Sequence, residues 1–577
     1  MAKSITTVWL IALLTGLMST GAATVQAQSP TSGTAGPLTW KYDTDMRILT
    51  ISGKGEMPDY DWEHPAPWEE HNREMLILVI EEGITRIGNQ AFENAGNLIS
   101  VILPKTVTRI GNDAFGFCGS LLMVTIPAGV TQIGDRAFIY CSNLAMATLP
   151  VTLQEIGENA FVQCRKLTSV AIPAEVKTIG AGAFAGCINV SAITVEAGNA
   201  HYVSVDGVLL NKEKTQLVQY PAGRAATSYV IPKEVTSIEA GAFGAAEKLT
   251  AITIPVGIVS IGRRAFEFCF ALTTISIPAT VKTIEANAFG YCQELTEIKV
   301  EAANTAYTSV DGVLFDKAKK TLITYPGGRK TTTYVIPYGV TNIESYAFEY
   351  TQNLTSITIP TSVKKIGLAA FASSVLTSVV IPEGVDTISD MTFRWCFNLR
   401  SVTLPASIKM IEFDAFTGCK KLEEMTVKAK TPPIVDNLVF ALVPVANVTL
   451  TVPKGSKAAY AAAPVWKEFK QISESTVGNV ALPEARIYAA GGRLYLTLQT
   501  AAPVGVSIPS TVCSSARSRL RRVRRRSRCL KACILSGSAN APRRCLLTKE
   551  LKPGDRASGY RARVARLFIF ILYITQS

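Results

Sequence analysis

The sequence predicts an α/β-type solenoid dominated by β-structure, with about 12 stacked coils, two β-hairpin islands and a β-rich cap at each end. A phenylalanine returns with a 23-residue period, and each one opens a phrase such as A-F-x-x-C-x-x-L-T-x-I-x-I-P. Within this phrase, apolar and polar residues alternate as in a half-buried strand. The repeated phenylalanines, which we expect to form the structural core, are Phe92, Phe115, Phe138, Phe161, Phe184, Phe243, Phe266, Phe289, Phe348, Phe371, Phe393 and Phe416.

Each coil is expected to contain a strand, a return stretch and a turn. In one coil, Leu167, Val170 and Ile172 are predicted to face the core, because their spacing is typical of a strand with one buried face. Pro173 ends that strand, since proline cannot donate a ladder hydrogen bond. After the return stretch, a turn or short helical piece is expected to bury the ring of Phe184.

Eight cysteines share one place in the coil, three residues after the repeated phenylalanine. Other coils carry Ala95, Ala246, Thr351 and Ser374 there, which indicates a small buried slot. We interpret the cysteines as a reduced, buried column. Disulfide pairing between neighbouring coils is the alternative, because stacked strands lie roughly 4.8 Å apart. The eight residues are Cys118, Cys141, Cys164, Cys187, Cys269, Cys292, Cys396 and Cys419.

Two steps of the period are longer than the others. Phe184 to Phe243 and Phe289 to Phe348 each span 59 residues, and the two inserts resemble each other. Both contain S-V-D-G-V-L, in which Asp-Gly between apolar residues indicates a two-residue hairpin turn. We therefore predict two small β-islands projecting from the stack, at about 196–231 and 301–336.

Caps are expected at both ends of the stack, because a terminal coil would otherwise expose an open sheet edge. The first residues resemble a secretory signal peptide cleaved after Ala27, with an apolar run too short to span a bilayer. An Ala-rich helix ending near Trp466 is expected in the last cap. The predicted parts are a signal peptide at 1–27, an N-terminal β cap at 28–75, the solenoid at 76–427, a C-terminal cap at 428–474 and a linker at 475–484.

These phrases resemble the BspA-like leucine-rich repeat family. The resemblance rests on A-F-x-x-C-x-x-L-x-x-I-x-I-P, on V-x-x-I-G-x-x-A-F, on the entry G-x-G-x-M-P-D-Y and on the exit V-P-K-G-S. It covers roughly 37–474 and implies a leucine-rich repeat stack in a secreted or surface-attached bacterial protein. Some members of the family bind host matrix or plasma proteins, or other bacteria. The resemblance supplies no catalytic residues.

Residues 485–508 resemble the start of a C-terminal sorting domain of type IX secretion, through A-R-I-Y-A-A-G-G-R-L-Y-L and P-V-G-V-S-I. Residues 509–577 depart from that pattern and form an aberrant basic tail, which we expect to be disordered. In a frame shifted by two bases, codons for Cys529 to Leu547 can be chosen to read PEGVYIVRVGERSEKVFV, which resembles the expected ending. We therefore hypothesise a frameshift near Ile508, which resequencing of the gene tests.

No catalytic, cofactor or metal site is predicted. The chain holds only His64, His71 and His201, and it lacks H-E-x-x-H, G-x-S-x-G and P-loop motifs. Asp43-Asp45 and Asp59-Asp61 have calcium-loop spacing but lack the glycine and the distal glutamate. The net charge of +13 comes from the tail, which holds 17 Lys and Arg against two acidic residues, so no nucleic-acid partner is predicted.

Aromatic residues form a stripe two residues after the repeated phenylalanine, and they are the candidate partner-binding residues. Aromatic side chains are favoured as interface anchors, but packing between coils explains the same pattern. An outward stripe of threonines is likewise either a polar recognition face or a set of β-forming residues. The aromatic candidates are Phe117, Tyr140, Phe268, Tyr291, Tyr350 and Trp395; the threonines are Thr125, Thr148, Thr194, Thr253, Thr358, Thr403 and Thr426.

Taken together, these features favour a non-enzymatic, monomeric adhesion module that binds a protein or glycan ligand on host or neighbouring cells. A surface hydrolase and a purely structural surface-layer component are the alternatives, and the scarcity of histidine argues against the hydrolase. We expect export without a transmembrane span. The location would be the cell surface or the extracellular space if the sorting domain is intact, and the periplasm for the chain as given.

Overall fold

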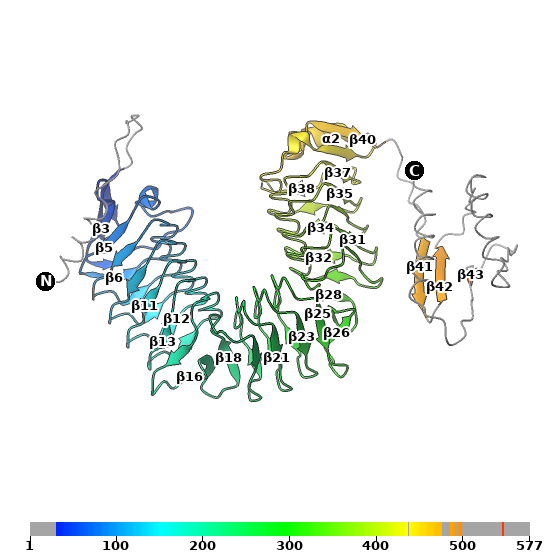
Figure 1. Cartoon of the computed structure of the whole chain (residues 1–577). Coiled ribbons are helices and arrows are strands. Elements are labelled where there is room, and N and C mark those ends of the chain that lie inside the picture. Colours follow the sequence, from blue (N-terminus) through cyan, green and yellow to red (C-terminus); the bar gives the residue numbers. More distant parts are fainter. Residues whose placement is uncertain (1–29, 437, 476–484, 491–492, 499–544, 547–577) are drawn as a thin grey trace. The chain divides into compact units, whose positions relative to one another are not determined.

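The computed structural model describes residues 30–436, 438–475, 485–490, 493–498 and 545–546. The chain divides into two compact units, Met1–Thr476 and Val477–Ser577. In the first unit, stacked coils form a solenoid built almost entirely of strands and turns, as predicted (Figure 1). The turn that follows each short strand holds the repeated phenylalanine and contains no helix in the described residues.

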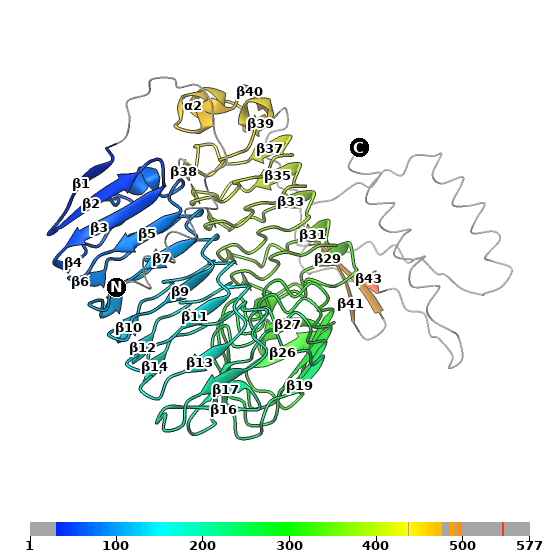
Figure 2. The same cartoon turned by 60° about the vertical axis from the view of Figure 1, so that its left-hand side comes forward.

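Each coil contributes one longer strand to the first side of the solenoid, here called the long-strand face (Figure 2). These strands pair in parallel with a regular register, for example Val170 with Ile193. They are β5 (Ile77–Ile80), β7 (Ser100–Ile102), β9 (Met123–Thr125), β11 (Met146–Thr148), β13 (Val170–Ile172), β15 (Ile193–Val195), β19 (Ser228–Val230), β21 (Ala251–Thr253), β23 (Thr274–Ile277), β25 (Glu297–Val300), β29 (Thr333–Val335), β31 (Ser356–Thr358), β33 (Ser378–Val380), β35 (Ser401–Leu404) and β37 (Glu424–Val427).

Each coil also contributes a shorter strand to a second parallel sheet. These strands bury one isoleucine each, such as Ile110 and Ile133, in most coils. They are β4 (Gly55–Glu56), β6 (Ile84–Ile87), β8 (Arg109–Ile110), β10 (Gln132–Ile133), β12 (Glu155–Ile156), β14 (Thr178–Ile179), β20 (Ser237–Ile238), β22 (Ser260–Ile261), β24 (Thr283–Ile284), β30 (Asn342–Ile343), β32 (Lys365–Ile366), β34 (Thr387–Ile388), β36 (Met410–Ile411) and β38 (Ile434–Val435).

The repeated phenylalanines form a ladder of stacked rings in the core. Phe115 and Phe138 are 5.3 Å apart between ring centroids, and Phe138 and Phe161 are 5.2 Å apart. All twelve rings are at most 4% exposed. The ladder extends beyond the predicted set, because Trp68 stacks on Phe92 and Phe440 stacks on Phe416. The side chains of neighbouring coils therefore bury one another, as expected for a solenoid.

The eight cysteines of the solenoid are free thiols, and all are buried. Each one donates a hydrogen bond from Sγ to the backbone carbonyl of the phenylalanine in the preceding coil. Cys141, for example, donates to the carbonyl oxygen of Phe115 at 3.2 Å. This bond gives the thiol and the carbonyl a partner in the core, and the eight free thiols support the reduced-column interpretation.

Each island contains the predicted hairpin and a third strand. In the first island, β16 (Tyr202–Val205) and β17 (Val208–Asn211) pair across Asp206-Gly207, and β17 pairs with β18 (Gln216–Gln219). The second island repeats this arrangement with β26 (Tyr307–Val310), β27 (Val313–Asp316) and β28 (Thr321–Thr324). Because β18 also pairs in parallel with β20, the third strand belongs to the stack and does not project from it.

The islands also close the open edge of the short-strand sheet. Buried Asn199 donates from Nδ2 to the carbonyls of Pro173 and Val176, at 2.8 and 3.1 Å. The Tyr202 hydroxyl accepts the N–H of Ile179 at 2.8 Å, where the sheet would otherwise end in an unpaired donor. Asn304 and Tyr307 make the corresponding bonds in the second island.

The N-terminal cap is a β-meander that continues the long-strand face. It consists of β1 (Ser32–Ala35), β2 (Leu38–Asp43) and β3 (Ile48–Gly53), and β3 pairs in parallel with β5. A 3-10 turn, η1 (Glu69–His71), follows. The C-terminal cap holds β39 (Thr449–Val452), β40 (Gln471–Glu474), η2 (Val445–Asn447), α2 (Lys457–Ala462) and η3 (Trp466–Glu468).

The helix of the C-terminal cap is shorter than predicted. It ends at Ala462, because Pro464 forces Ala463 into an extended conformation with ψ of 142°. In the second unit, β41 (Ala485–Ala490), β42 (Arg493–Leu498) and β43 (Cys545–Leu546) form an antiparallel sheet. The predicted signal peptide, most of the linker and nearly all of the basic tail lie outside the described residues.

Candidate partner-binding surface

The turns of successive coils form a third ladder of hydrogen bonds along the solenoid. The N–H groups of Asp113, Phe115 and Phe117 donate to carbonyls in the next coil at 2.8, 2.8 and 2.7 Å. Asp113 and Phe117 both have left-handed backbone, with φ of 52° and 61°. The same two places, two residues before and two residues after the repeated phenylalanine, have positive φ in every regular turn of the described solenoid.

All six predicted aromatic residues occupy the second of these left-handed places. Their φ values run from 56° for Tyr140 to 61° for Phe117. A left-handed backbone costs a residue with a β-carbon roughly 1–2 kcal/mol, so glycine and asparagine are the residues that suit it. Asn94, Gly186 and Gly418 occupy the same place in other coils. The aromatic side chains are therefore present despite a backbone cost.

The stacking order divides the aromatic residues into three groups. The first group is Phe117 and Tyr140, whose rings stack at 5.2 Å with an interplanar angle of 9°. Phe117 is 42% exposed and Tyr140 is 44% exposed. These two rings form a rigid shelf that solvent can reach, held by the backbone ladder beneath them.

The second group is Phe268, Tyr291 and Tyr350. The centroids of Phe268 and Tyr291, and those of Tyr291 and Tyr350, are 4.7 Å apart. Tyr291 and Tyr350 meet although 58 residues separate them, because the coil at the second island does not form a full turn between them. The rings of this group are half-buried.

The third group is centred on Trp395. Arg394 lies over its ring at 5.6 Å from the centroid, and Phe397, which is half exposed, lies 5.7 Å away. A β-carbon added to Gly418 would lie 2.2 Å from the Trp395 ring, so the neighbouring coil leaves room for the indole. Ser373 separates this group from Tyr350 on the stripe.

Two half-buried carboxyls, Glu349 and Glu267, accompany the second group. Glu349 accepts hydrogen bonds from the Tyr291 hydroxyl at 3.1 Å and from Asn287 Nδ2 at 3.0 Å. Burial raises the pKa of Glu349 to about 7, and the neighbouring Glu267 adds to that increase. Burial likewise raises the pKa of Glu267 to about 6, against the opposing effect of Arg264. The protonation state of this group therefore changes near neutral pH.

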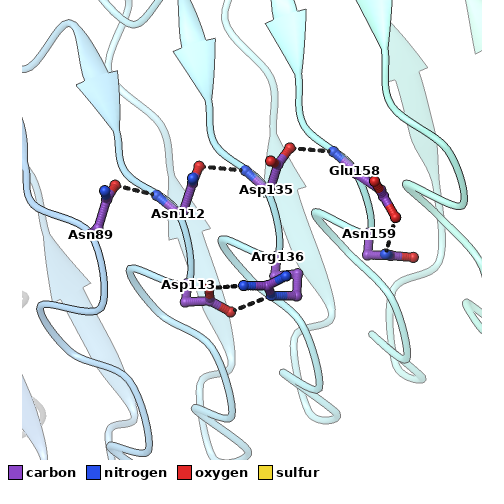
Figure 3. Close-up of polar contacts among 7 residues, drawn as sticks. All are labelled: Asn89, Asn112, Asp113, Asp135, Arg136, Glu158 and Asn159. Carbon is purple, nitrogen blue, oxygen red and sulfur yellow. Dashed lines mark hydrogen bonds and ion pairs between the residues drawn. The ribbon is translucent and has the colours of Figure 1, made fainter. Parts of the chain in front are cut away.

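A polar ladder runs beside the turns of the first coils (Figure 3). The Asn89 side-chain oxygen accepts the N–H of Asn112 at 2.8 Å, Asn112 accepts the N–H of Asp135 at 2.9 Å, and Asp135 accepts that of Glu158 at 2.7 Å. Asp59 begins this ladder by accepting the N–H of Asn89 at 2.8 Å. These side chains satisfy backbone donors, which is a structural role.

Coils with glutamate after the short strand satisfy the same donor from the opposite direction. Glu285 accepts the N–H of Arg263 at 2.9 Å, and Glu412 accepts that of Asp390 at 3.2 Å, each in the preceding coil. Where glycine stands instead, the backbone of the preceding coil is too close for a side chain. A β-carbon on Gly157 would lie 2.4 Å from the Asp135 nitrogen.

An ion pair between a buried carboxylate and a half-exposed guanidinium lies close to the first aromatic group in sequence. Arg136 donates to both oxygens of Asp113, at 2.8 and 2.6 Å (Figure 3). The Asp113 side chain is 7% exposed and that of Arg136 is 52% exposed. The hydrogen bond to Asp113 raises the pKa of Arg136, so the guanidinium is a fixed positive charge on this side of the solenoid.

The aspartates with calcium-loop spacing have other partners. Asp43 accepts the N–H groups of Asp45 and Met46, and Asp61 accepts those of Glu63 and His64. Within the described ranges, no group of three or more His, Cys, Asp or Glu side chains is placed to hold a metal ion. No helix among the described residues has the length and hydropathy to cross a membrane.

Comparison with protein families gives a match over most of the solenoid. The profile described as "BspA type Leucine rich repeat region (6 copies)" matches residues 71–198, 222–330 and 327–441. No curated protein sequence matches the chain.

Among solved structures, the chain is similar to a leucine-rich repeat protein from Eubacterium ventriosum, at 23% identity and a TM-score of 0.43, covering 78% of this chain and 96% of the other. It is also similar to a leucine rich cell surface protein from Faecalibacterium prausnitzii, at 23% identity, a TM-score of 0.32, and 78% and 97% coverage. The pneumococcal vaccine antigen PcpA matches at 16% identity, a TM-score of 0.31, and 77% and 99% coverage.

Proposed function

The chain belongs to the BspA type leucine rich repeat family, and we propose that it is an exported bacterial surface protein that binds a protein or glycan ligand on host or neighbouring cells. Its partner-binding surface is the turn side of the solenoid, with Phe117 and Tyr140 as the principal anchors. The second and third aromatic groups extend the same surface toward the C-terminal cap.

The observation that carries this proposal is the exposed pair of stacked rings on left-handed backbone. Core packing does not account for Phe117 and Tyr140, because more than 40% of each side chain faces solvent. The backbone cost is roughly 1–2 kcal/mol for each residue, and strain of this kind gathers at functional sites. The turn ladder fixes both rings before binding, which lowers the ordering cost of an interface.

The surroundings of the rings also support a binding role. The Arg136 guanidinium, paired with Asp113, supplies a charged group in the same turn as Tyr140. Aromatic anchors with a polar rim are typical of protein interfaces. Export is supported by the signal-peptide pattern at 1–27 and by the sorting-domain resemblance at 485–508, and we propose that the protein acts as a monomer.

A binding array of matrix proteins, plasma proteins and glycans tests this function with the full chain. The test variant is Phe117→Asn/Tyr140→Asn, because asparagine suits left-handed backbone and removes both rings. The matched control is Leu442→Asn, which changes an exposed residue at the same place in a later turn. We expect saturable binding that weakens at least tenfold in the double variant and is unchanged in the control.

Two outcomes contradict the proposal. If no array component binds saturably, or if the double variant binds as strongly as the wild type, the assignment of this surface is wrong. Turnover of any array component would favour the hydrolase alternative.

A further inference from the structure

The outward side chains of the long-strand face change in polarity along the solenoid. In each coil, three residues of the long-strand stretch point outward, and they occupy equivalent places from coil to coil. Met123 pairs in register with Met146, and Ser100 with Met123. The backbone ladder continues through Ile99, Leu122 and Ala145, whose N–H groups each donate to the preceding coil.

In the coils of β5, β7, β9 and β11, these outward places are mostly apolar and none is charged. We call this set the apolar face. Three of its side chains are strongly exposed, at 51% for Leu122, 55% for Met123 and 56% for Met146. Its members are Leu76, Val79, Ile99, Ile102, Leu122, Met123, Ala145 and Met146, and the remaining apolar place is held by Ile77, which is buried.

Later coils carry small or polar residues at the first two of these outward places. The places of Leu122 and Met123 are held by Thr250 and Ala251 in one coil and by Thr355 and Ser356 in another. The later threonines bond to the preceding coil, as Thr250 Oγ1 does to the Thr227 carbonyl at 3.0 Å. The fold therefore does not require apolar side chains here, and their exposure in the first coils calls for a partner.

We propose that the apolar face docks one amphipathic α-helix of a partner protein. Four strands at about 4.8 Å spacing give a stripe about 19 Å long, and three outward residues give a width of about 10 Å. A helix of about 13 residues has that length, and its diameter of about 10 Å matches the width. Methionine suits such a surface, because its flexible thioether adapts to the shape of the helix.

The size and charge of the apolar face decide between this occupant and others. Its area of about 190 Å² is well below the roughly 800 Å² that each partner of a stable dimer contributes, so it cannot hold a second copy by itself. The outward places of these coils carry no Lys or Arg, whereas attachment to an anionic membrane surface relies on basic residues. This face lies on a different side of the coil from the aromatic turns, so the inference is independent of the proposed ligand surface.

Fluorescence anisotropy tests the proposal with the full chain and a defined peptide. The peptide is a neutral, 14-residue amphipathic helix with leucines on one face, held helical by a side-chain crosslink. The test variant is Leu122→Thr/Met123→Ser/Met146→Ser, which installs the residue types that later coils carry at these places. We expect saturable binding to the wild type and at least tenfold weaker binding to this variant.

The matched control is Val230→Thr/Val335→Thr/Val380→Thr, which replaces three apolar residues on the long-strand face of later coils that are at least as exposed. It should bind the peptide as the wild type does, and both triple variants should keep the circular dichroism spectrum and melting temperature. Equal binding of an uncrosslinked version of the peptide, with a proline at its centre to prevent helix formation, would overturn the proposal. Self-association or binding to neutral phosphatidylcholine vesicles, if lost in the test variant, would assign the face to a second copy or to lipid and would also overturn it.

Discussion

The ring of Tyr220 stacks on the ring of Phe243, with 5.2 Å between their centroids. Tyr220 thus takes the place of a repeated phenylalanine in the coil that contains the first island. Tyr325 does the same in the second island, at 5.1 Å from Phe348. Each island is therefore a modified coil, and it keeps a large aromatic ring in the core.

The same substitution in these two tyrosines should have opposite effects on stability. The buried Tyr220 hydroxyl has no hydrogen-bond partner within the described residues, whereas the Tyr325 hydroxyl bonds to Thr331 Oγ1 at 2.8 Å. We expect Tyr220→Phe to raise the free energy of unfolding by up to about 1 kcal/mol and Tyr325→Phe to lower it by about 1 kcal/mol. Chemical denaturation measures both. Equal shifts of the same sign would contradict the assignment.

Stability should depend on pH through Glu349. Its pKa rises from the ordinary value of 4.5 to about 7 in the folded protein. The folded state therefore binds this proton more tightly, so the contribution is complete below pH 4.5 and is lost as pH rises through 7. We expect the free energy of unfolding to fall across this window by on the order of 3 kcal/mol, at roughly 1.4 kcal/mol per pKa unit.

Glu349→Gln keeps a neutral side chain at every pH and should remove most of this dependence. The double variant Glu267→Gln/Glu349→Gln should be flatter still, because the raised pKa of Glu267 acts in the same direction. Denaturation curves between pH 4 and 8 give the comparison. An undiminished slope in both variants would show that neither carboxyl is responsible.

At positions with left-handed backbone, a substitution to glycine should stabilise the fold, and a substitution from glycine should destabilise it. Leu442 is 62% exposed with φ of 61°, so Leu442→Gly loses little burial and relieves the backbone. We expect the free energy of unfolding to rise by about 1 kcal/mol. Gly418→Ala at the equivalent place should lower it by about 1–3 kcal/mol, because the new methyl meets Trp395. Thermal melts of both variants provide the test.

Close approach between coils makes Gly157 a second sensitive position. A β-carbon there lies 2.4 Å from the Asp135 nitrogen and from the Gly134 carbonyl carbon. We expect Gly157→Ala to destabilise the fold by about 1–3 kcal/mol or more. Gly96→Ala is the matched control, since its nearest contact is 4.0 Å away. Similar melting temperatures for the two variants would contradict the packing.

The solenoid thiols should stay unmodified in the folded protein. Burial raises the pKa of Cys187 and Cys269 to about 12, and all eight thiols are buried. Only the thiolate reacts with iodoacetamide, so peptide mapping by mass spectrometry should find these cysteines alkylated at pH 8 only after denaturation. A disulfide-linked pair of solenoid peptides would contradict the reduced column.

Most features of the coil were predictable because they depend on residues that lie close together in the chain. The 23-residue period, the buried Phe161 and the hairpin at Asp206-Gly207 each follow from residues close together in the chain. The ring partners Tyr220 and Tyr325 were missed, although each lies 23 residues before the next repeated phenylalanine. The period is visible only for phenylalanine, whereas the core requires only a large ring at that place.

The aromatic stripe was predicted as a set, but its grouping was not. Tyr291 and Tyr350 touch because the coil of the second island does not form a full turn between them. No local sequence pattern indicates which two turns will be neighbours in the stack. The aromatic residues themselves do not indicate the left-handed backbone beneath these rings, since aromatic residues do not normally favour it. Asn94 and Gly186 at the same place were the available signal.

The sequence by itself determined the repeating coil, because a strand pattern and a buried ring every 23 residues depend on nearest neighbours. The tertiary structure alone decided which outward residues become a surface. The exposed shelf of Phe117 and Tyr140, the half-buried Glu349 bonded to Tyr291 and the apolar face around Met123 all arise from contacts between coils. Those contacts depend on how coils stack in register, and stacking brings together residues that lie 23 or more positions apart.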